Sequence, residues 1–206
     1  MKAICLFSGG KDSTVALAWS VENYAEVMTL SFNYRKRPTC ERVAAREISA
    51  RLFVKHIEID LPFITTVGEV EKDLNGPPVT EAPYLPMRDL VFHSIALSIA
   101  ESAHADAIVA GHIKSDGNLY RATTHDYLTR IYSVANSGTY AYGGSPAVHI
   151  ELQLPLIEKT GTEVIQLGQA LMAPLELSWS CLLDGPKPCG ICAGCRNRKR
   201  LNILAL

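Results

Sequence analysis

The chain has 206 residues, of which 48% are hydrophobic and 20% charged, and its formal net charge at pH 7 is −1. This length fits one α/β domain, and the balanced charge gives no bulk attraction to nucleic acid or to a membrane surface. The apolar start is too short for a signal peptide, and no stretch reaches the roughly 18 apolar residues that span a bilayer. We therefore expect a cytoplasmic protein without a membrane anchor.

The N-terminal part of the chain alternates short apolar runs with segments of helical period. We expect strands over residues 2–7, 27–32 and 55–59, and helices over residues 13–24 and 39–53. Thr39 is placed to cap the second helix. This β-α-β-α-β order predicts a parallel sheet flanked by helices.

Residues 62–86 contain five prolines and several acidic side chains, which argue against regular structure. We predict a loop there, which either covers a ligand site or is disordered. Beyond it we expect helices over residues 88–103, 125–136 and 162–172 and strands over residues 107–110 and 148–152. The loops after Phe7, Phe32 and Ala110 then open at the carboxyl edge of the sheet, where parallel sheets bind ligands.

A glycine-rich turn joins the first predicted strand to the first predicted helix. Residues 8–14 read Ser-Gly-Gly-Lys-Asp-Ser-Thr. Adjacent glycines let a ligand approach the backbone, and the free N–H groups of a helix start attract phosphate. The spacing is not that of a P-loop kinase or GTPase. The turn predicts a phosphate cradle in which Asp12 either binds Mg²⁺ or orders the loop; the alternative is a tight turn that only caps the helix.

Four of the six cysteines lie close together, at positions 181, 189, 192 and 195. Four thiolates can close a tetrahedral shell around zinc at about 2.3 Å per bond, and a closed shell is structural because it leaves no position for water. Two alternatives remain open at this point: a redox or sulfur-carrying pair of Cys189 with Cys192, and a four-cysteine iron–sulfur cluster.

Residues 8–13 resemble the signature of the N-type ATP pyrophosphatases, which cleave ATP between the α- and β-phosphates to adenylate a carboxylate or carbonyl oxygen. Most of the chain is similar to the 7-cyano-7-deazaguanine synthase family. The matching stretches are Leu30-Ser31-Phe32-x-Tyr34-x-x-Arg37 with Glu41 and residues 44–48, Leu85-Pro86-Met87-Arg88, Leu177-Ser178-Trp179-Ser180-Cys181, and Cys189-Gly190-x-Cys192-x-x-Cys195-Arg196.

The resemblance implies an adenine nucleotide alpha hydrolase-like (HUP, Rossmann-like) α/β fold, with residues 1–175 as the ATP-pyrophosphatase domain and residues 176–206 as a zinc-binding segment packed on it. It implies ATP, Mg²⁺ and Zn²⁺ as cofactors, a deazaguanine carboxylate and ammonia as substrates, and a homodimer. The residues expected to bind ATP are Leu6, Phe7, Ser8, Gly9, Gly10, Lys11, Asp12, Ser13, Thr14, Phe32 and Gly111. Those expected in catalysis are Ser8, Asp12, Ser13 and Arg88, those expected to bind substrate are Tyr34, Arg37, Arg88, Asp116 and Tyr120, and the zinc ligands are Cys181, Cys189, Cys192 and Cys195.

The chain departs from the family pattern in its expected substrate loop, residues 116–124, where only Asp116 and Tyr120 match. The usual Arg-Asn before the third helix is here Arg88-Asp89, and Gly161 replaces a common lysine, with Lys159 nearby as a replacement. These changes alter the charges that a site can neutralise. They leave ATP activation as the firmer expectation and the acceptor as the open one.

Four functions are compatible with this pattern. The first is synthesis of 7-cyano-7-deazaguanine: the carboxylate is adenylated, ammonia gives the amide, and a second activation gives the nitrile. The second keeps the adenylation but conjugates the deazaguanine to an amine of a protein or nucleic acid. The third is a tRNA-thiolating enzyme, and the fourth is a zinc-stapled nucleotide-binding module without catalysis.

Other charged and titratable residues receive simpler interpretations. His93 and His104 are expected on a helix as packing or surface residues. His112 and His125 flank the loop after Ala110; each is either an acid–base group or a structural residue, and a single histidine near a turn is more often structural. The basic run 196–200 is interpreted as a solvated helix face or as a balance for thiolate charge, with nucleic acid or ATP phosphate as the alternative partner.

Overall fold

The computed structural model describes residues 1–34, 37–64, 85–140 and 147–203. In chain order the elements are β1 (Lys2–Leu6), α1 (Lys11–Asn23), β2 (Glu26–Tyr34), α2 (Thr39–Arg51), β3 (Lys55–Leu61), α3 (Arg88–Ser102), β4 (Ala107–Val109), α4 (Lys114–Leu119), η1 (Arg121–Thr123), α5 (His125–Ser137), β5 (Glu151–Gln153), α6 (Gly161–Ala170), η2 (Leu175–Leu177) and α7 (Ala193–Arg200). No helix in these ranges is long and apolar enough to cross a membrane.

The five strands form one parallel sheet in the order β3-β2-β1-β4-β5. β1 lies in the middle, where Ile4 pairs with Met28 of β2 and with Ile108 of β4. Its central residues are fully buried, as expected of a strand covered on both faces. The strand order reverses between β1 and β4, and such a reversal opens a crevice at the carboxyl edge of the sheet.

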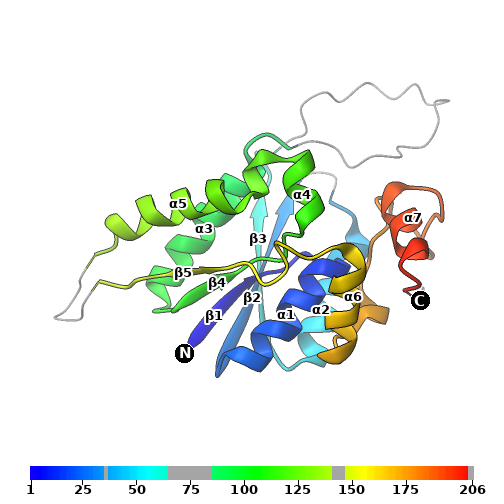
Figure 1. Ribbon diagram of the computed structural model, residues 1–206, viewed down its shortest axis with the longest axis horizontal. Helices are drawn as coiled ribbons and strands as arrows, with labels where there is room; N and C mark the ends of the chain where they lie inside the picture. Colours follow the sequence, from blue (N-terminus) through cyan, green and yellow to red (C-terminus); the bar gives the residue numbers. More distant parts are fainter. Residues whose placement is uncertain (35–36, 65–84, 141–146, 204–206) are drawn as a thin grey trace.

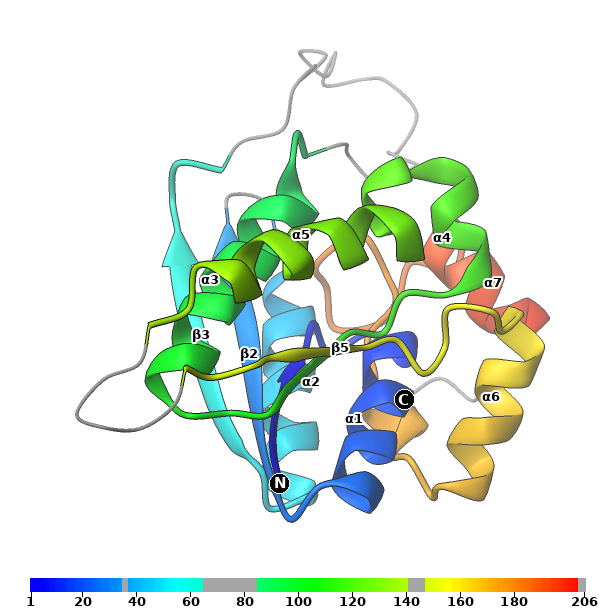
Figure 2. The ribbon, with the colours of Figure 1, turned by 60° about the vertical axis from the view of Figure 1, so that its left-hand side comes forward.

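Helices cover both faces of the sheet (Figures 1 and 2). One core packs α1, α2 and α6 against the sheet through residues such as Leu17, Ile48 and Val164. The other packs α3 and α5 on the opposite face through residues such as Leu97 and Tyr132. The predicted parallel sheet flanked by helices is confirmed.

Several predicted boundaries are corrected. Thr39 does not cap α2 with its side chain; it is the first helical residue, and the amide of Cys40 donates instead to Asp184 Oδ1 at 2.9 Å. The strand predicted from residue 148 begins at Glu151, because the side chain of Asn136 binds both the N–H and the C=O of Ile150 (2.8 and 2.9 Å). His104 follows α3 and does not lie on it.

One helix, α4, escaped prediction, and another, α7, begins before the basic run that indicated it. α4 is short and its sequence, Lys-Ser-Asp-Gly-Asn-Leu, has the composition of a turn. α7 begins inside the cysteine cluster, where Cys192 Sγ accepts a hydrogen bond from the amide of Cys195 at 3.4 Å. Most of the proline-rich segment that we interpret as a lid or as disorder, residues 65–84, lies outside the described residues.

Candidate ATP site and four-cysteine cluster

The glycine-rich turn lies directly after β1, at the reversal in strand order. Gly9 has φ +90°, and a Cβ there would lie 2.5 Å from the carbonyl oxygen of Glu41 and 2.7 Å from the amide nitrogen of Ala45. Only glycine fits such a conformation at such a short distance from the start of α2. The turn therefore packs against α2 as well as against α1, the helix that it begins.

Hydroxyl groups stabilise the turn from within. Ser8 Oγ accepts from the amide of Gly10 and lies 3.1 Å from Ser13 Oγ. Ser13 and Thr14 donate to the carbonyl of Gly10 at 3.0 and 2.9 Å. Thr14 is fully buried. These contacts fix the conformation of the loop. Ser8 and Ser13 line an open pocket, whereas the buried Thr14 holds the carbonyl of Gly10 on the side away from it.

A pocket of about 290 Å³ opens over this turn. It is lined by the ends of β1, β2 and β4 and by the start of α3, through Leu6, Phe7, Ser8, Gly10, Asp12, Ser13, Leu30, Phe32, Tyr34, Arg37, Glu41, Arg88, Asp89, Phe92, His93, Ala110, Gly111 and His112. Most residues expected to bind ATP are among them, whereas Gly9, Lys11 and Thr14 are not. Gly111 comes close to the turn, since a Cβ there would lie 3.0 Å from Asp12 O and from Ser13 N.

Asp12 carries an unused acceptor at this pocket. Its Oδ2 pairs with Lys11 Nζ at 2.5 Å, while its buried Oδ1 has no hydrogen-bond partner among the described residues. A buried carboxylate oxygen without a protein partner fits a cation, and Mg²⁺ prefers such oxygen ligands. The chemistry of Asp12 thus fits the Mg²⁺ that accompanies ATP.

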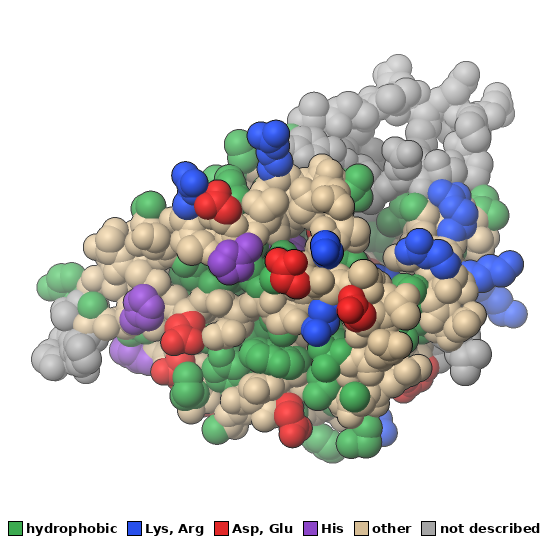
Figure 3. Space-filling model, in the orientation of Figure 1, with side chains coloured by type: hydrophobic (Ala, Val, Ile, Leu, Met, Phe, Trp, Pro, Cys, Tyr) green, Lys and Arg blue, Asp and Glu red, His purple; other side chains and the backbone are tan. Residues whose placement is uncertain are grey.

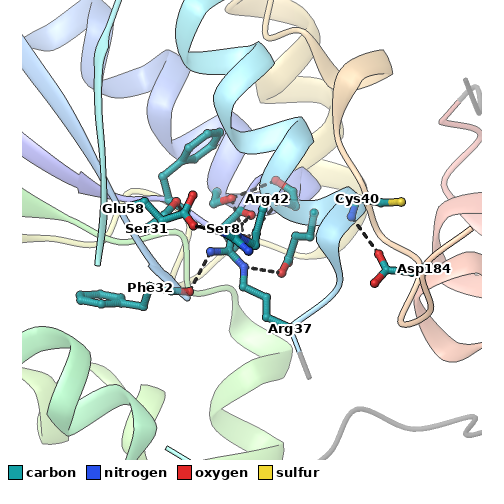
Figure 4. Close-up of polar contacts among 12 residues, drawn as sticks. Ser8, Ser31, Phe32, Arg37, Cys40, Arg42, Glu58 and Asp184 are labelled. Carbon is teal, nitrogen blue, oxygen red and sulfur yellow. Dashed lines mark hydrogen bonds and ion pairs between the residues drawn. The ribbon is translucent and has the colours of Figure 1, made fainter. Parts of the chain in front are cut away.

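Arg37 joins the loops that follow β1 and β2 (Figure 4). Its guanidinium donates to Ser8 O at 2.6 Å and to Phe32 O at 2.7 Å, and its Nε donates to Glu41 Oε2 at 3.0 Å. Arg37 is buried and lines the pocket. These contacts give it a bracing role that sequence reasoning missed, and its contact with substrate remains a prediction.

A second pocket of about 270 Å³ adjoins the first. It is lined by Leu85, Met87, Arg88, Asp89, Leu119, Tyr120, Arg121, Ala122 and Tyr127. Arg88 and Asp89 line both pockets. Met87, the residue before α3, has φ +52°, which is uncommon for a residue with a side chain.

The residues expected to bind substrate fall in different places. Tyr34 and Arg37 line the first pocket, Tyr120 lines the second, and Arg88 lines both. Asp116 lines neither; its Oδ2 accepts from the amide of Ile113 at 3.0 Å, at the start of α4. Asp116 therefore caps α4, and its contact with substrate stays a prediction.

A buried cluster of polar rings lies on the wall of the first pocket. His112 Nε2 lies 4.0 Å from Asp89 Oδ1, and the His112 and His93 rings are 5.9 Å apart. His93 Nδ1 lies 2.9 Å from the hydroxyl of Tyr132. Burial lowers the pKa of His93 to about 3, with His112 as a second cause, and burial also lowers the pKa of His112. Both rings are neutral at physiological pH. Sequence reasoning assigned His93 to packing and did not connect it with His112.

The four predicted cysteines converge. Their sulfur atoms all lie within 4.8 Å of one another, and two pairs, Cys181 with Cys192 and Cys189 with Cys195, are 3.9 Å apart. A zinc tetrahedron with bonds of about 2.3 Å has sulfur–sulfur edges of about 3.8 Å. The geometry thus fits a tetrahedral metal such as zinc, with the four thiolates as its complete shell.

The thiols of the cluster differ in pKa. Amide groups of Ile191 and Cys192 lower the pKa of Cys189 to about 6, whereas burial raises the pKa of Cys195 to about 12. Metal ligands must be thiolates, so a bound cation would have to hold Cys195 deprotonated against the effect of its burial.

The cysteine segment contacts the glycine-rich turn and α2. The amide of Trp179 donates to Gly9 O at 2.9 Å. Asp184 accepts from the amide of Cys40 (Figure 4), and the amides of Thr39 and Cys40 lower the pKa of Asp184. At Gly194 the backbone of α7 meets the segment so closely that a Cβ would lie 1.8 Å from Ser180 O.

Comparison with known proteins identifies the family. The model of the family described as "Queuosine biosynthesis protein QueC" matches residues 2–202. The chain belongs to the QueC family. A 7-cyano-7-deazaguanine synthase of Nitratiruptor sp. is 33% identical to it, over 96% of this chain and 92% of the relative. A 7-cyano-7-deazaguanine synthase of Campylobacter hominis is 34% identical, over 96% and 93%.

Solved structures agree on the fold of this QueC family member. A 4-thiouridine synthetase in complex with RNA and bound ATP superposes with a TM-score of 0.56 at 19% identity, over 98% of this chain and 49% of the other. A predicted tRNA methyltransferase subunit from Methanocaldococcus jannaschii gives 0.51 at 19% identity, over 82% and 74%. The predictions of the family, of an ATP-using ligase-type enzyme and of the α/β fold are confirmed.

The basic C-terminal run divides into two kinds of residue in this QueC chain. Arg198 is buried and donates to Ser178 O at 2.8 Å and to Leu175 O at 3.0 Å. Arg196, Lys199 and Arg200 are exposed, and Figure 3 shows Lys and Arg side chains gathered over α7. One arginine thus anchors the helix, and the others form a solvated face, as the sequence indicated.

Proposed function

We propose that this chain adenylates 7-carboxy-7-deazaguanine and converts it through the amide to 7-cyano-7-deazaguanine, releasing AMP and pyrophosphate. One observation carries the proposal: a pocket over the glycine-rich turn meets a second pocket at Arg88 and Asp89. An acyl adenylate needs two connected sites, one for the nucleotide and one for the acyl group. The relatives are named after the product 7-cyano-7-deazaguanine, and from this product we infer that the acyl group is the deazaguanine carboxylate.

The first pocket is assigned to ATP. Loop amides between Ser8 and Ser13, at the start of α1, would hold the phosphates, since helix starts favour anions. Leu6, Phe7 and Phe32 would line the nucleotide, and Gly111 leaves room beside the loop. Mg²⁺ would bind Asp12 Oδ1 and neutralise charge on the departing pyrophosphate.

The second pocket is assigned to the deazaguanine. Tyr120 and Tyr127 offer aromatic faces to a flat base, and Leu119 adds apolar surface. Arg88 lies where the two pockets meet and would neutralise the substrate carboxylate and then the developing charge on the acyl phosphate. Tyr34 and Arg37 would complete the wall on the nucleotide side.

The chemistry needs no covalent enzyme intermediate. A carboxylate oxygen attacks the α-phosphorus of ATP and pyrophosphate leaves; ammonia then displaces AMP from the acyl carbon to give the amide. A second adenylation, on the amide oxygen, allows loss of AMP and formation of the nitrile. The protein contributes positioning, charge stabilisation and exclusion of water from the acyl adenylate.

We assign a structural role to zinc in the closed four-cysteine shell, which leaves no position for a reactive water. The segment 176–206 would then be part of the same domain, fastened by the bond from Trp179 to Gly9 and by the cap from Asp184. The homodimer and the cytoplasmic location remain predictions.

Mass spectrometry tests the proposed reaction. Purified protein is incubated with Mg-ATP and 7-carboxy-7-deazaguanine, with and without ammonium. Amide and nitrile should appear with AMP and pyrophosphate only when ammonium is present. Absence of ATP turnover with this carboxylate would refute the proposal and favour another substrate or the non-catalytic binding module.

A second candidate function is conjugation of the deazaguanine to a macromolecular amine. Exposed apolar side chains at the second pocket favour it: Leu119 is 74% exposed and Met87 59% exposed, so a large acceptor has a surface to contact beside the acyl site. Adding candidate proteins and nucleic acids to the same assay tests it. A mass increase on an acceptor would support conjugation, whereas free nitrile alone would refute it. A thiolated RNA product would instead indicate the tRNA-thiolating alternative.

A further inference from the structure

The acyl carbon of the adenylate has a defined place if the proposed function holds. It is bonded to the nucleotide on one side and to the deazaguanine on the other, so it must lie where the two pockets join. Among their lining residues only Arg88 and Asp89 belong to both. The attacking amine therefore meets the acyl carbon beside Asp89.

A base is available at that point. His112 lines the nucleotide pocket, and its Nε2 lies 4.0 Å from Asp89 Oδ1, close enough for the carboxylate to stabilise an imidazolium. Both side chains are largely shielded from water, with 16% and 11% of their surface exposed. His93 packs behind His112, and its Nε2 has no hydrogen-bond partner among the described residues.

We propose that His112, paired with Asp89, is the general base that accepts the proton of the amine that attacks the acyl adenylate. This inference rests on the proposed function and deepens it. The amine nitrogen forms a bond to the acyl carbon, the bond from that carbon to the AMP oxygen breaks, and its electron pair leaves on the phosphate of AMP. The proton released by nitrogen goes to His112 and later to water.

The surroundings set the charge of His112 at rest. Asp89, Arg88 and His93 face it from α3, and Asp116 approaches it from α4. Burial lowers the pKa of His112 and Arg88 acts in the same direction, whereas Asp89 and Asp116 oppose them. The ring is consequently neutral and able to accept a proton at neutral pH.

Two amines separate base catalysis from a structural role. Ammonia needs a base because the nitrogen stays strongly basic after attack. Hydroxylamine, which is weakly basic, loses its proton to water without help and forms a hydroxamate. His112→Gln keeps a polar side chain but cannot act as the base. In this variant the rate of amide formation from ammonia should fall about 100-fold relative to the rate of hydroxamate formation, because general base catalysis typically contributes a rate factor of about that size. His149→Gln, at an exposed histidine before β5, is the matched control and should leave the ratio of the two products as in wild type.

Equal losses with both amines in His112→Gln would overturn the proposal and assign His112 to packing or ATP binding, and no loss would overturn it as well. If that variant does not fold, the same comparison of the two products is made with His112→Asn and with the wild-type protein as a function of pH. The wild-type ratio of amide to hydroxamate, corrected for free ammonia, should fall as His112 is protonated, at a pH below its ordinary pKa of 6.5. A flat ratio would contradict the proposal. If the wild-type protein makes neither AMP nor hydroxamate, the proposed function itself is refuted. That result is distinguishable from failure of the His112 proposal, in which the wild-type protein still turns over ATP.

Discussion

The backbone amide of Trp179 donates a 2.9 Å hydrogen bond to the carbonyl oxygen of Gly9. This bond joins the segment that carries the first cysteine of the cluster to the turn that faces the first pocket. Gly10 lies at the same contact, since a Cβ there would be 3.7 Å from Trp179 O. The four-cysteine cluster and the glycine-rich turn are therefore mechanically connected, although none of the described cysteines lines the first pocket.

Loss of the metal should weaken both stability and ATP use. Cys192→Ser removes a buried ligand, and we expect it to lose zinc and at least about 2 kcal/mol of unfolding free energy, because a structural metal contributes folding energy directly. The Michaelis constant for ATP should rise through the Trp179 contact. Metal analysis, denaturant unfolding and pyrophosphate release measure the three effects. Cys40→Ser, outside the cluster, should keep its zinc; full zinc content in Cys192→Ser would contradict the assignment.

Asp12→Asn should abolish most of the adenylation while leaving the fold intact. The amide cannot supply the anionic oxygen that Mg²⁺ and the departing pyrophosphate require, so the rate of pyrophosphate release should fall about 100-fold or more. Circular dichroism and thermal unfolding report on the fold. Asp126→Asn, an exposed carboxylate on α5, is the control and should behave like wild type. Unchanged turnover in Asp12→Asn would remove Asp12 from the mechanism.

Gly9→Ala should destabilise the protein by more than about 2 kcal/mol, because the new Cβ would collide with backbone atoms of Glu41 and Ala45 at a positive φ. Gly138→Ala is the comparison: its φ is −106° and the nearest atom to a Cβ there is 3.5 Å away. Urea unfolding of both variants measures the difference. Similar stability of the two would show that the turn can move away from α2.

Acidification should destabilise the protein through His93. Its pKa is lowered to about 3 in the folded state, whereas the unfolded chain takes up a proton below the ordinary value of 6.5. Stability is thus complete above pH 6.5 and falls between pH 6.5 and 3, by up to about 1.4 kcal/mol per pH unit for this group. His56 and His112 shift in the same direction, so the His93→Gln variant is needed to isolate the effect. Its unfolding free energy should decline less between pH 6.5 and 5 than that of wild type; an equal decline would show that His93 does not contribute.

The spacing of neighbouring residues in the sequence predicted the main elements and motifs of this protein. It did not predict contacts between residues far apart in the sequence. The turn at residues 8–14 and the four cysteines were predictable because their chemistry depends on neighbours in the sequence. The bracing by Arg37 was not, because its acceptors, Ser8 O and Phe32 O, come together only after two strands pair. The Asp184 cap of α2 likewise joins distant parts of the chain.

The same reason explains which contacts at the site local spacing did not predict. Asp116 lies three residues after Ile113 and caps a short helix, which the turn-like composition of that segment did not indicate. His93 has the spacing of a core residue on α3, and it is buried. Its relation to His112 depends on how α3 packs against β4, which helical periodicity alone does not specify.

The most direct test of the central claim follows one oxygen atom. 7-Carboxy-7-deazaguanine labelled with ¹⁸O in its carboxylate is incubated with the protein, Mg-ATP and ammonium, and the AMP is analysed by mass spectrometry. If the chain adenylates the carboxylate, the AMP from the first activation carries one ¹⁸O from the substrate. AMP without label, or ADP in its place, would contradict the account.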